Sequence, residues 1–173
     1  PAPEASATAP AAPGAADATV FRFRPAPRAT MDDELGRAAV LLDQSKRALF
    51  DMFNEARMGC AVEVRDAMPM VESIAASVLR NPGALIGLAR LKTADNYTYM
   101  HSVAVCALMI ALARQLGLDD HLARELGLAG LLHDVGKMAV PAEVLNKPGS
   151  LTEDEFCVVR SHPAQGHAML LAS

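Results

Sequence analysis

The sequence contains no tryptophan, and aromatic residues make up only 4% of its 173 positions. A core without large rings must be built from aliphatic side chains, and the abundant Ala, Leu, Met and Val are typical of packed helices. Cysteine is also scarce, since Cys60, Cys106 and Cys157 lie far apart and form no CxxC pair. This odd, scattered set argues against a disulfide framework and indicates buried, reduced thiols in a cytoplasmic protein.

An excess of positive charge is absent as well, because the net charge is −4 at pH 7. Without a stripe of Lys and Arg we expect no nucleic-acid partner, and any anionic ligand must be met by local charge. The longest apolar run, residues 103–113, is shorter than the roughly 20 residues that a membrane-spanning helix needs. The chain opens with Pro1 and shows no signal peptide. We therefore expect no membrane span here, and a native protein that extends further upstream.

Composition divides the chain into three regions. Residues 1–30 are rich in Ala and Pro and show no periodicity. Such a segment cannot bury enough apolar surface to fold, so we expect a disordered linker. Residues 31–69 are expected to form an N-terminal helical region, and residues 70–173 a helical domain that carries the polar motifs described below.

Apolar residues recur at helical spacing over most of this length, and cap signals separate the segments. Asn81-Pro82 begins a new helix, and Thr152 with Glu155 forms a capping box. Pro69 is expected to kink its helix or to break it in two. The expected helices are 31–59, 62–80, 83–91, 96–116, 120–133, 141–145, 153–161 and 162–171. No segment alternates with the period of a strand, so the sequence predicts an all-α fold.

A histidine and an aspartate on adjacent residues, His133 and Asp134, follow the apolar run 126–132. Ionisable groups at the end of a buried segment are costly unless they are compensated. A divalent metal is one compensation, because imidazole and carboxylate are ordinary ligands for it. Lys137, about one helical turn later, would then meet an anionic substrate. The structural alternative is a helix-terminal pair that is hydrogen-bonded to backbone, beside a solvated lysine.

His101 is the second histidine of interest. It lies in the first two turns of the 96–116 helix, and Leu108 and Leu112 lie near its face, so we expect it to point toward the core. If this helix and the next are antiparallel, His101 meets the His133–Asp134 pair at one end of the bundle. Taken alone, a histidine on an apolar face is also explained as a hydrogen-bonded core residue.

His162 and Lys147 complete the candidates. His162 precedes Pro163, which favours extended backbone at a helix start and a side chain that points into a cleft. An ordinary N-cap is the alternative for His162. Lys147 lies in the turn after the His-Asp motif and is a candidate substrate-binding residue. The alternative is that the residues of this turn serve only to form the turn.

Together, His101, His133, Asp134 and His162 offer three imidazoles and one carboxylate as metal ligands. That set is enough for the nucleus of a one- or two-metal site. A carboxylate that bridges two cations could position a hydroxide for in-line attack on phosphorus, and Lys137 would neutralise a phosphate oxygen. Asp134 and Lys137 are therefore the candidate catalytic residues. Mixed nitrogen and oxygen ligation suits Fe or Mn, and Zn less specifically.

Four motifs at these spacings resemble the HD-GYP branch of the HD phosphohydrolase superfamily. They read DNYTYMHS over residues 95–102, LLHDVGK over 131–137, NKPGSLT over 146–152 and HPAQGH over 162–167. HDxGK alone is shared across HD hydrolases, whereas HDVGK together with NKPGxLT and HPxxG is a specific combination. The resemblance covers residues 70–170.

The resemblance implies an all-helical, HD-domain-like bundle that hydrolyses the bacterial second messenger cyclic di-GMP to the linear dinucleotide or to GMP. It implies two or three metal ions, often iron or manganese. His101, His133, Asp134 and His162 correspond to metal ligands, Asp134 to the bridging carboxylate and Lys137 to a phosphate contact. Some members have a Glu where this chain has Tyr97, which implies two metals rather than three.

The family's remaining signatures, an adjacent histidine pair, the GYP loop and a further Asp ligand, follow the point at which Ser173 stands. The resemblance therefore implies a truncated bundle, about half of the catalytic domain, and we expect this piece alone to be inactive. Apolar surface left open by the truncation predicts self-association. Two other interpretations stay open: a non-catalytic helical module that binds signalling partners, and an HD phosphohydrolase that acts on another nucleotide.

Overall fold

The computed structural model describes residues 28–90 and 97–172, and in this part of the chain every regular element is a helix. This confirms the predicted all-α fold. The expected disordered linker falls mainly on residues 1–27, which lie outside the described residues. Residues 28–30 lead directly into the first helix, where Thr30 accepts a hydrogen bond from the backbone N–H of Asp33 as the N-cap.

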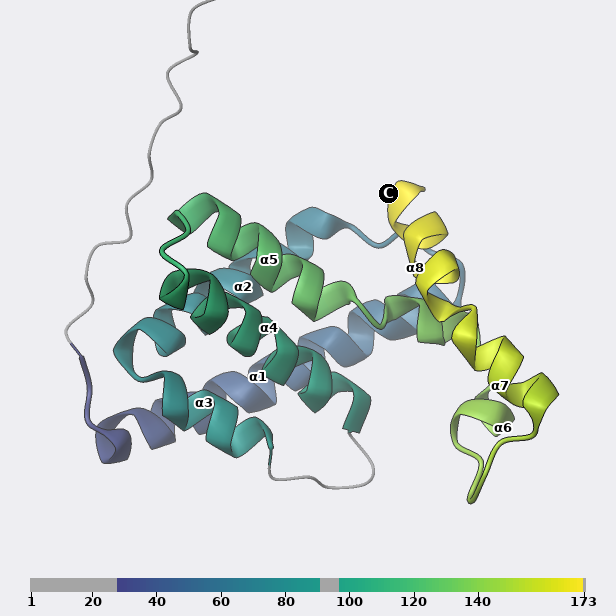
Figure 1. Cartoon of the computed structure of the whole chain (residues 1–173), viewed down its shortest axis with the longest axis horizontal. Coiled ribbons are helices and arrows are strands. Elements are labelled where there is room, and N and C mark those ends of the chain that lie inside the picture. Colours follow the sequence, from purple (N-terminus) through teal and green to yellow (C-terminus); the bar gives the residue numbers. More distant parts are fainter. Residues whose placement is uncertain (1–27, 91–96, 173) are drawn as a thin grey trace, which may run out of the picture.

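The helices follow one another with short connections, and α6 to α8 lie together at one end of the molecule (Figure 1). The bounds agree with the expected segments to within a turn. They are α1 Met31–Arg57, α2 Val64–Arg80, α3 Pro82–Ala89, α4 Tyr97–Gln115, α5 Asp120–Leu132, the 3-10 helix η2 Val135–Ala139, α6 Ala142–Leu145, α7 Glu153–Arg160 and α8 His162–Leu171.

Helix α2 runs without interruption through Pro69, so the expected alternative of two separate helices is wrong. Pro69 lies in the second turn, where it removes only the hydrogen bond that its own N–H would donate to Arg65. The apolar face of α2, with Val71, Ile74 and Val78, is buried. Packing of that face therefore holds the helix together across the missing bond.

Helices α1 to α5 enclose one aliphatic core to which both predicted regions contribute. Helix α1 packs on α2, α3 and α4, and α4 packs most extensively on α5. The largest fully buried side chains include Leu49 and Phe53 from α1, Ile74 from α2, Ile110 from α4 and Leu131 from α5. Helices α4 and α5 are joined by a short turn and lie side by side (Figure 1), which brings the start of one beside the end of the other.

Helices α1 and α2 are joined by a buried ion pair between Glu34 and Arg80. The sequence analysis does not predict this pair. The Glu34 side chain is fully buried and accepts hydrogen bonds from Arg80 Nε and Nη2, both at 2.8 Å, and from Ser77 Oγ at 2.9 Å. The hydrogen bond from Arg80, opposed by burial, lowers the pKa of Glu34. Because every carboxylate oxygen is satisfied, the charge is tolerated inside the fold.

The cysteine prediction is right for one residue of three. Cys106 is buried, and burial raises the pKa of its thiol to about 12. Cys60 and Cys157 are exposed, so the expectation that all three are buried is wrong. Among the described residues, no helix is both long and apolar enough to cross a membrane.

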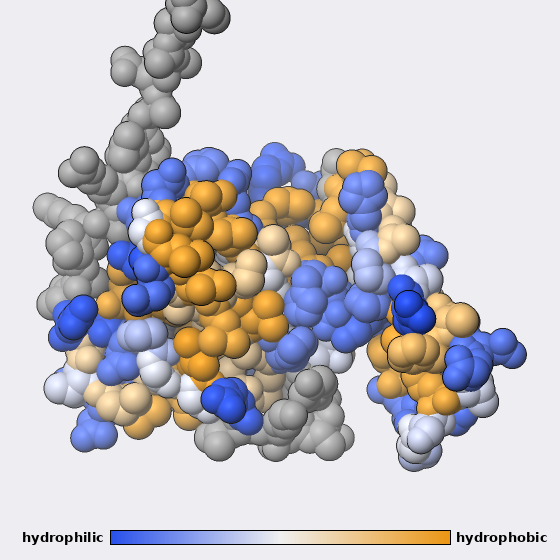
Figure 2. All heavy atoms as spheres, in the orientation of Figure 1, coloured by the Kyte–Doolittle hydropathy of each residue, from blue (hydrophilic) through white to orange (hydrophobic). Residues whose placement is uncertain are grey.

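Apolar side chains also gather on the outer surface over α4 and α5 (Figure 2). On α4 and just after it, Leu108 is 49% exposed, Leu112 is 53% exposed and Leu116 is 66% exposed. We call these three residues the α4 outer face. An exposed apolar row of this kind favours self-association, which stays a prediction.

Candidate metal centre

The antiparallel pairing of α4 and α5 brings the first candidates together. His133 is the C-cap of α5, and Asp134 follows it into η2 with only 3% of its surface exposed. The rings of His101 and His133 lie edge to face, with centroids 5.2 Å apart. Residues that are 32 positions apart in the sequence thus meet at one end of the helix pair, as the antiparallel arrangement predicts.

The carboxylate of Asp134 is the point on which the imidazoles converge. Its Oδ2 atom lies 3.2 Å from His133 Nε2 and 3.8 Å from His101 Nε2. Its Oδ1 atom lies 3.4 Å from His162 Nε2. The structure therefore brings together all four residues of the predicted ligand set, while their role as ligands stays a prediction.

Backbone carbonyls orient two of the three rings. His133 Nδ1 donates to the Gly130 carbonyl at 2.8 Å, and His162 Nδ1 donates to the Val159 carbonyl at 2.8 Å. A neutral ring that donates through Nδ1 presents the lone pair of Nε2. Both Nε2 atoms then face a carboxylate, which is also an acceptor. Two hydrogen-bond acceptors placed face to face are favourable only if a proton or a cation lies between them. Histidines that bind metals are commonly oriented by such a hydrogen bond from Nδ1 to a backbone carbonyl.

The donor set fits a divalent metal. Ligand atoms held at about 2.1 Å in neighbouring positions of one metal lie about 3 Å apart, close to the observed separations. The ligand atoms of His101, His133 and Asp134 all lie within 4.8 Å of one another. This is a group of nitrogen and oxygen donors that could hold a metal ion, and its composition suits a borderline divalent cation.

Positive charge already surrounds the carboxylate. Lys137 Nζ donates to Asp134 Oδ2 at 2.7 Å. Burial raises the pKa of Asp134, but the hydrogen bonds from His133 and Lys137 outweigh it and hold that pKa far below its usual range. The hydrogen bond to Asp134 in turn raises the pKa of His133. Asp134 is therefore ionised at neutral pH and ready to hold a cation.

His162 reaches the site by a route that differs from the expected one. It is the first residue of helix α8, and Ser161 before it is also helical, with φ −76° and ψ −12°. The expected extended backbone at His162 is therefore wrong, because α7 turns into α8 through Ser161 without an extended residue. Packing of α8 on η2, rather than a proline-directed bend, aims this imidazole at Asp134.

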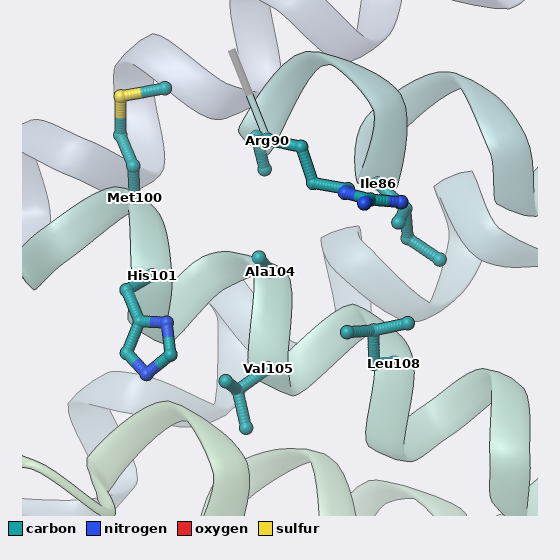
Figure 3. A pocket seen from close by; sticks show the side chains of 8 residues that line it. Ile86, Arg90, Met100, His101, Ala104, Val105 and Leu108 are labelled. Atoms are coloured by element: carbon teal, nitrogen blue, oxygen red, sulfur yellow. The ribbon is translucent and has the colours of Figure 1, made fainter. Parts of the chain in front are cut away.

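His101 also differs from expectation. It lies on α4 at the rim of a cavity of about 220 Å³, also lined by Ile86 and Arg90 of the α3 end, and its ring turns away from Arg90 (Figure 3). Leu108 and Leu112, expected to share a core-facing side with it, are exposed. The core-facing side of α4 carries Val103, Cys106 and Ile110 instead, so His101 sits at the border between core and surface.

A second cavity, of about 600 Å³, adjoins the site. Lys137 lines it and links it to Asp134, and Lys147 lines it from the turn after α6. Lys147 Nζ also donates to Glu155 Oε2 at 2.5 Å, inside the capping box of α7. Both predicted substrate-contacting lysines thus border one cavity, although Lys147 also has a structural partner.

Comparison with known proteins places the chain in a family. Residues 69–173 match the model of the HD domain. A cyclic di-GMP phosphodiesterase of Pseudomonas aeruginosa is 60% identical over 144 residues, which cover 83% of this chain and 35% of that protein. The chain therefore spans about a third of that relative's length.

Two shorter matches are a cyclic di-GMP phosphodiesterase response regulator of Xanthomonas campestris and a 3'3'-cGAMP-specific phosphodiesterase of Vibrio cholerae. The first is 49% identical over 61 residues, covering 35% of this chain and 16% of that protein. The second is 42% identical over 68 residues, covering 39% of this chain and 16% of that protein. No solved structure matches the chain. The match of the family model over more than half of the chain shows that it belongs to the HD domain family, as its motifs predicted.

Proposed function

We propose that this chain carries the first part of a metal-dependent phosphodiesterase that hydrolyses cyclic di-GMP. The observation that supports it most is the convergence of three imidazole Nε2 atoms on the buried Asp134 carboxylate, beside Lys137 and a cavity. The substrate follows from the relatives, since the one that is 60% identical is named a cyclic di-GMP phosphodiesterase. The proposed domain begins near residue 70, where the family match also begins.

We assign His101, His133, Asp134 and His162 as the residues that would hold two divalent ions, with Asp134 as the carboxylate that both ions would share. Iron or manganese suits these donors best, and zinc less well. Such metals supply a nucleophile from water at neutral pH and Lewis acidity at the phosphoryl group. The sequence has Tyr97 at the position where some members of the resembled family carry a Glu, which favours two ions.

The chain's own residues would perform three tasks in this reaction. The carbonyls of Gly130 and Val159 hold the imidazoles of His133 and His162 in one orientation, so that little reorganisation accompanies the reaction. Lys137 lies between Asp134 and the cavity, where its ammonium group would neutralise a non-bridging phosphate oxygen. Lys147 would contact a phosphate further along the same cavity.

A second substrate is supported by one specific observation. The Vibrio cholerae relative is named for 3'3'-cGAMP, so an HD phosphohydrolase acting on that cyclic dinucleotide is the next candidate. A non-catalytic module that binds signalling partners is the remaining alternative. For all three candidate functions, a cytoplasmic location stays a prediction.

Metal analysis and turnover of the intact protein that contains this chain separate these candidates. We expect bound Fe or Mn and hydrolysis of cyclic di-GMP, and loss of both in Asp134→Ala. Hydrolysis of 3'3'-cGAMP alone would favour the second substrate. Protein that binds no metal and hydrolyses neither dinucleotide would contradict the proposal and favour the module.

A further inference from the structure

One wall of the cavity beside the metal centre carries aromatic and amide side chains, which binding of a phosphate group would not require. It is formed by Phe50, Asn54 and Arg57 of α1 together with Tyr99 of α4. Helix α1 lies before the matched HD domain, which begins at residue 69. The cavity volume of about 600 Å³ is in the range of small-molecule sites. One end of this cavity reaches Lys137, so the wall and the metal centre face the same space.

The three α1 residues share one helical face. Phe50, Asn54 and Arg57 are spaced one and two turns apart, so their side chains project in the same direction. Phe53, between them in sequence, is fully buried, whereas Phe50 is 48% exposed. The core therefore takes the other side of α1, and the Phe50–Arg57 side is turned toward the cavity instead.

Arg57 is held near the site without being neutralised. Its Nη2 atom lies 3.6 Å from the sulfur of Met138, the residue that follows Lys137. Among the described residues, no carboxylate forms an ion pair with Arg57, whereas Lys137 and Lys147 are paired with Asp134 and Glu155. A guanidinium carries five N–H donors, so Arg57 keeps donors that can bind a ligand in this cavity.

Aromatic surface adjoins that guanidinium. The rings of Phe50 and Tyr99 lie edge to face, with centroids 5.6 Å apart. Two aromatic rings, an amide and a guanidinium on one wall form a suitable surface for a nucleobase. Bases stack on aromatic side chains, and an arginine fork matches the O6 and N7 acceptors of guanine.

We propose that Arg57, with the Phe50–Tyr99 pair and Asn54, forms a base-binding subsite that recognises a guanine of the substrate. The subsite rests on the proposed function, because it assumes a cyclic dinucleotide whose phosphate is met at Lys137. In this arrangement α1 is a part of the active site that sets substrate preference, and Arg57 is a specificity residue that takes no part in the chemical step.

The test compares two substrates in the intact, metal-loaded protein. Arg57→Ala should raise KM for cyclic di-GMP by roughly tenfold or more, the size of a lost bidentate base contact, while kcat changes little. Bis(p-nitrophenyl) phosphate has no base, so its hydrolysis should be unchanged. Arg57→Lys keeps the charge but lacks the fork and should resemble Arg57→Ala. Arg47→Ala is the matched control, since Arg47 lies on α1, is 76% exposed and pairs with Asp43.

Three results would overturn the base-binding subsite while leaving the proposed function in place. One is an unchanged KM in Arg57→Ala, and another is an equal loss on both substrates, which would indicate general attraction of phosphate. Full activity of Arg57→Lys would likewise assign a role to charge alone. Failure of the wild-type protein to bind or hydrolyse cyclic di-GMP would overturn the proposed function and the subsite with it. Thermal unfolding of each variant separates these results from loss of folding.

Discussion

Gly136 of η2 and Gly166 of α8 lie backbone against backbone, with no space for a β-carbon on Gly136. A Cβ at Gly136 would overlap the carbonyl oxygen of His162 and the amide nitrogen of Gly166. A Cβ at Gly166 would lie 3.1 Å from the Gly136 nitrogen, which is tight but closer to an ordinary contact. This crossing seats α8 on η2, and it is what brings His162 within reach of Asp134.

The two glycines should therefore differ in their tolerance of alanine. Gly136→Ala should displace α8 and reduce metal affinity strongly, since His162 moves with that helix. Gly166→Ala needs a shift of only a few tenths of an ångström and should retain most of the bound metal. Metal content after reconstitution, with circular dichroism as a check on folding, measures the difference. Equal metal content in Gly136→Ala and the wild type would contradict this account of the crossing.

Removal of single ligands tests the assignment of the metal centre. His133→Ala, Asp134→Asn and His162→Ala should each lose more metal affinity than the roughly 10–100-fold that loss of an outer hydrogen-bond partner costs. His121→Ala is the matched control, because His121 is 79% exposed and faces only Glu125 at 3.7 Å among the contacts that the structure shows. Elemental analysis of the purified proteins gives the result. Metal retained in all three ligand variants would refute the site.

Substitution of the two lysines of the cavity should affect different kinetic constants. Lys137→Met should lower kcat by about 10²-fold, the usual effect of removing a group that stabilises transition-state charge. Lys147→Ala should raise KM with a smaller change in kcat, because this lysine lies further along the cavity. Steady-state kinetics on cyclic di-GMP with metal content held equal provides the measurement. If Lys137→Met loses its metal instead, the lysine serves to hold Asp134 and not the substrate.

The buried pair of Glu34 and Arg80 predicts a pH-dependent stability. Glu34→Ala leaves Arg80 and Ser77 without their partner and should cost about 3 kcal/mol of unfolding free energy at neutral pH. The hydrogen bond from Arg80 lowers the folded pKa of Glu34 below its ordinary value of 4.5. The stabilisation is therefore complete above that value and is lost as the pH falls through the lower, folded pKa.

Denaturant unfolding of wild type and Glu34→Ala at several pH values checks this sign. The difference between the two proteins should be largest at neutral pH and should shrink in acid. A difference that grows as the pH falls would show that another group dominates. Asp43→Ala is a suitable comparison, since Asp43 is a half-exposed carboxylate on the same helix and surface pairs contribute little.

The α4 outer face predicts association of this chain in solution. Leu112→Glu should shift the chain toward monomer, because a charge in an apolar contact is costly to bury. Val40→Glu, at a position on α1 that is 59% exposed, is the control and should leave the association unchanged. Light scattering over a range of concentrations measures it. A monomeric wild-type chain at high concentration would exclude the association.

Much of the helical framework follows from local sequence. The side chains of Thr152 and Glu155 form the expected capping box, and Asn81 caps α3 with Pro82 at its start, as predicted. These signals are local because a cap joins groups within one turn of each other. Two expectations are wrong for the opposite reason: the extended backbone at His162, and the break that was one of two outcomes expected at Pro69. Packing of α8 on η2 and of α2 on the core outweighs local preference at these positions.

For the candidate site too, some features could be predicted from local sequence and others depend on how the helices pack. The identity of its polar residues could be recognised from spacing, because His133 and Asp134 are adjacent and Lys137 lies one turn later. Their convergence with His101 and His162 was only a hypothesis until the paths of α4 and α8 were known. Glu34 and Arg57 had no signal in the sequence at all, since each looks like an ordinary charge on an amphipathic helix. Which charges face a buried partner or a cavity depends on how helices far apart in the chain pack, and that is decided by the tertiary structure alone.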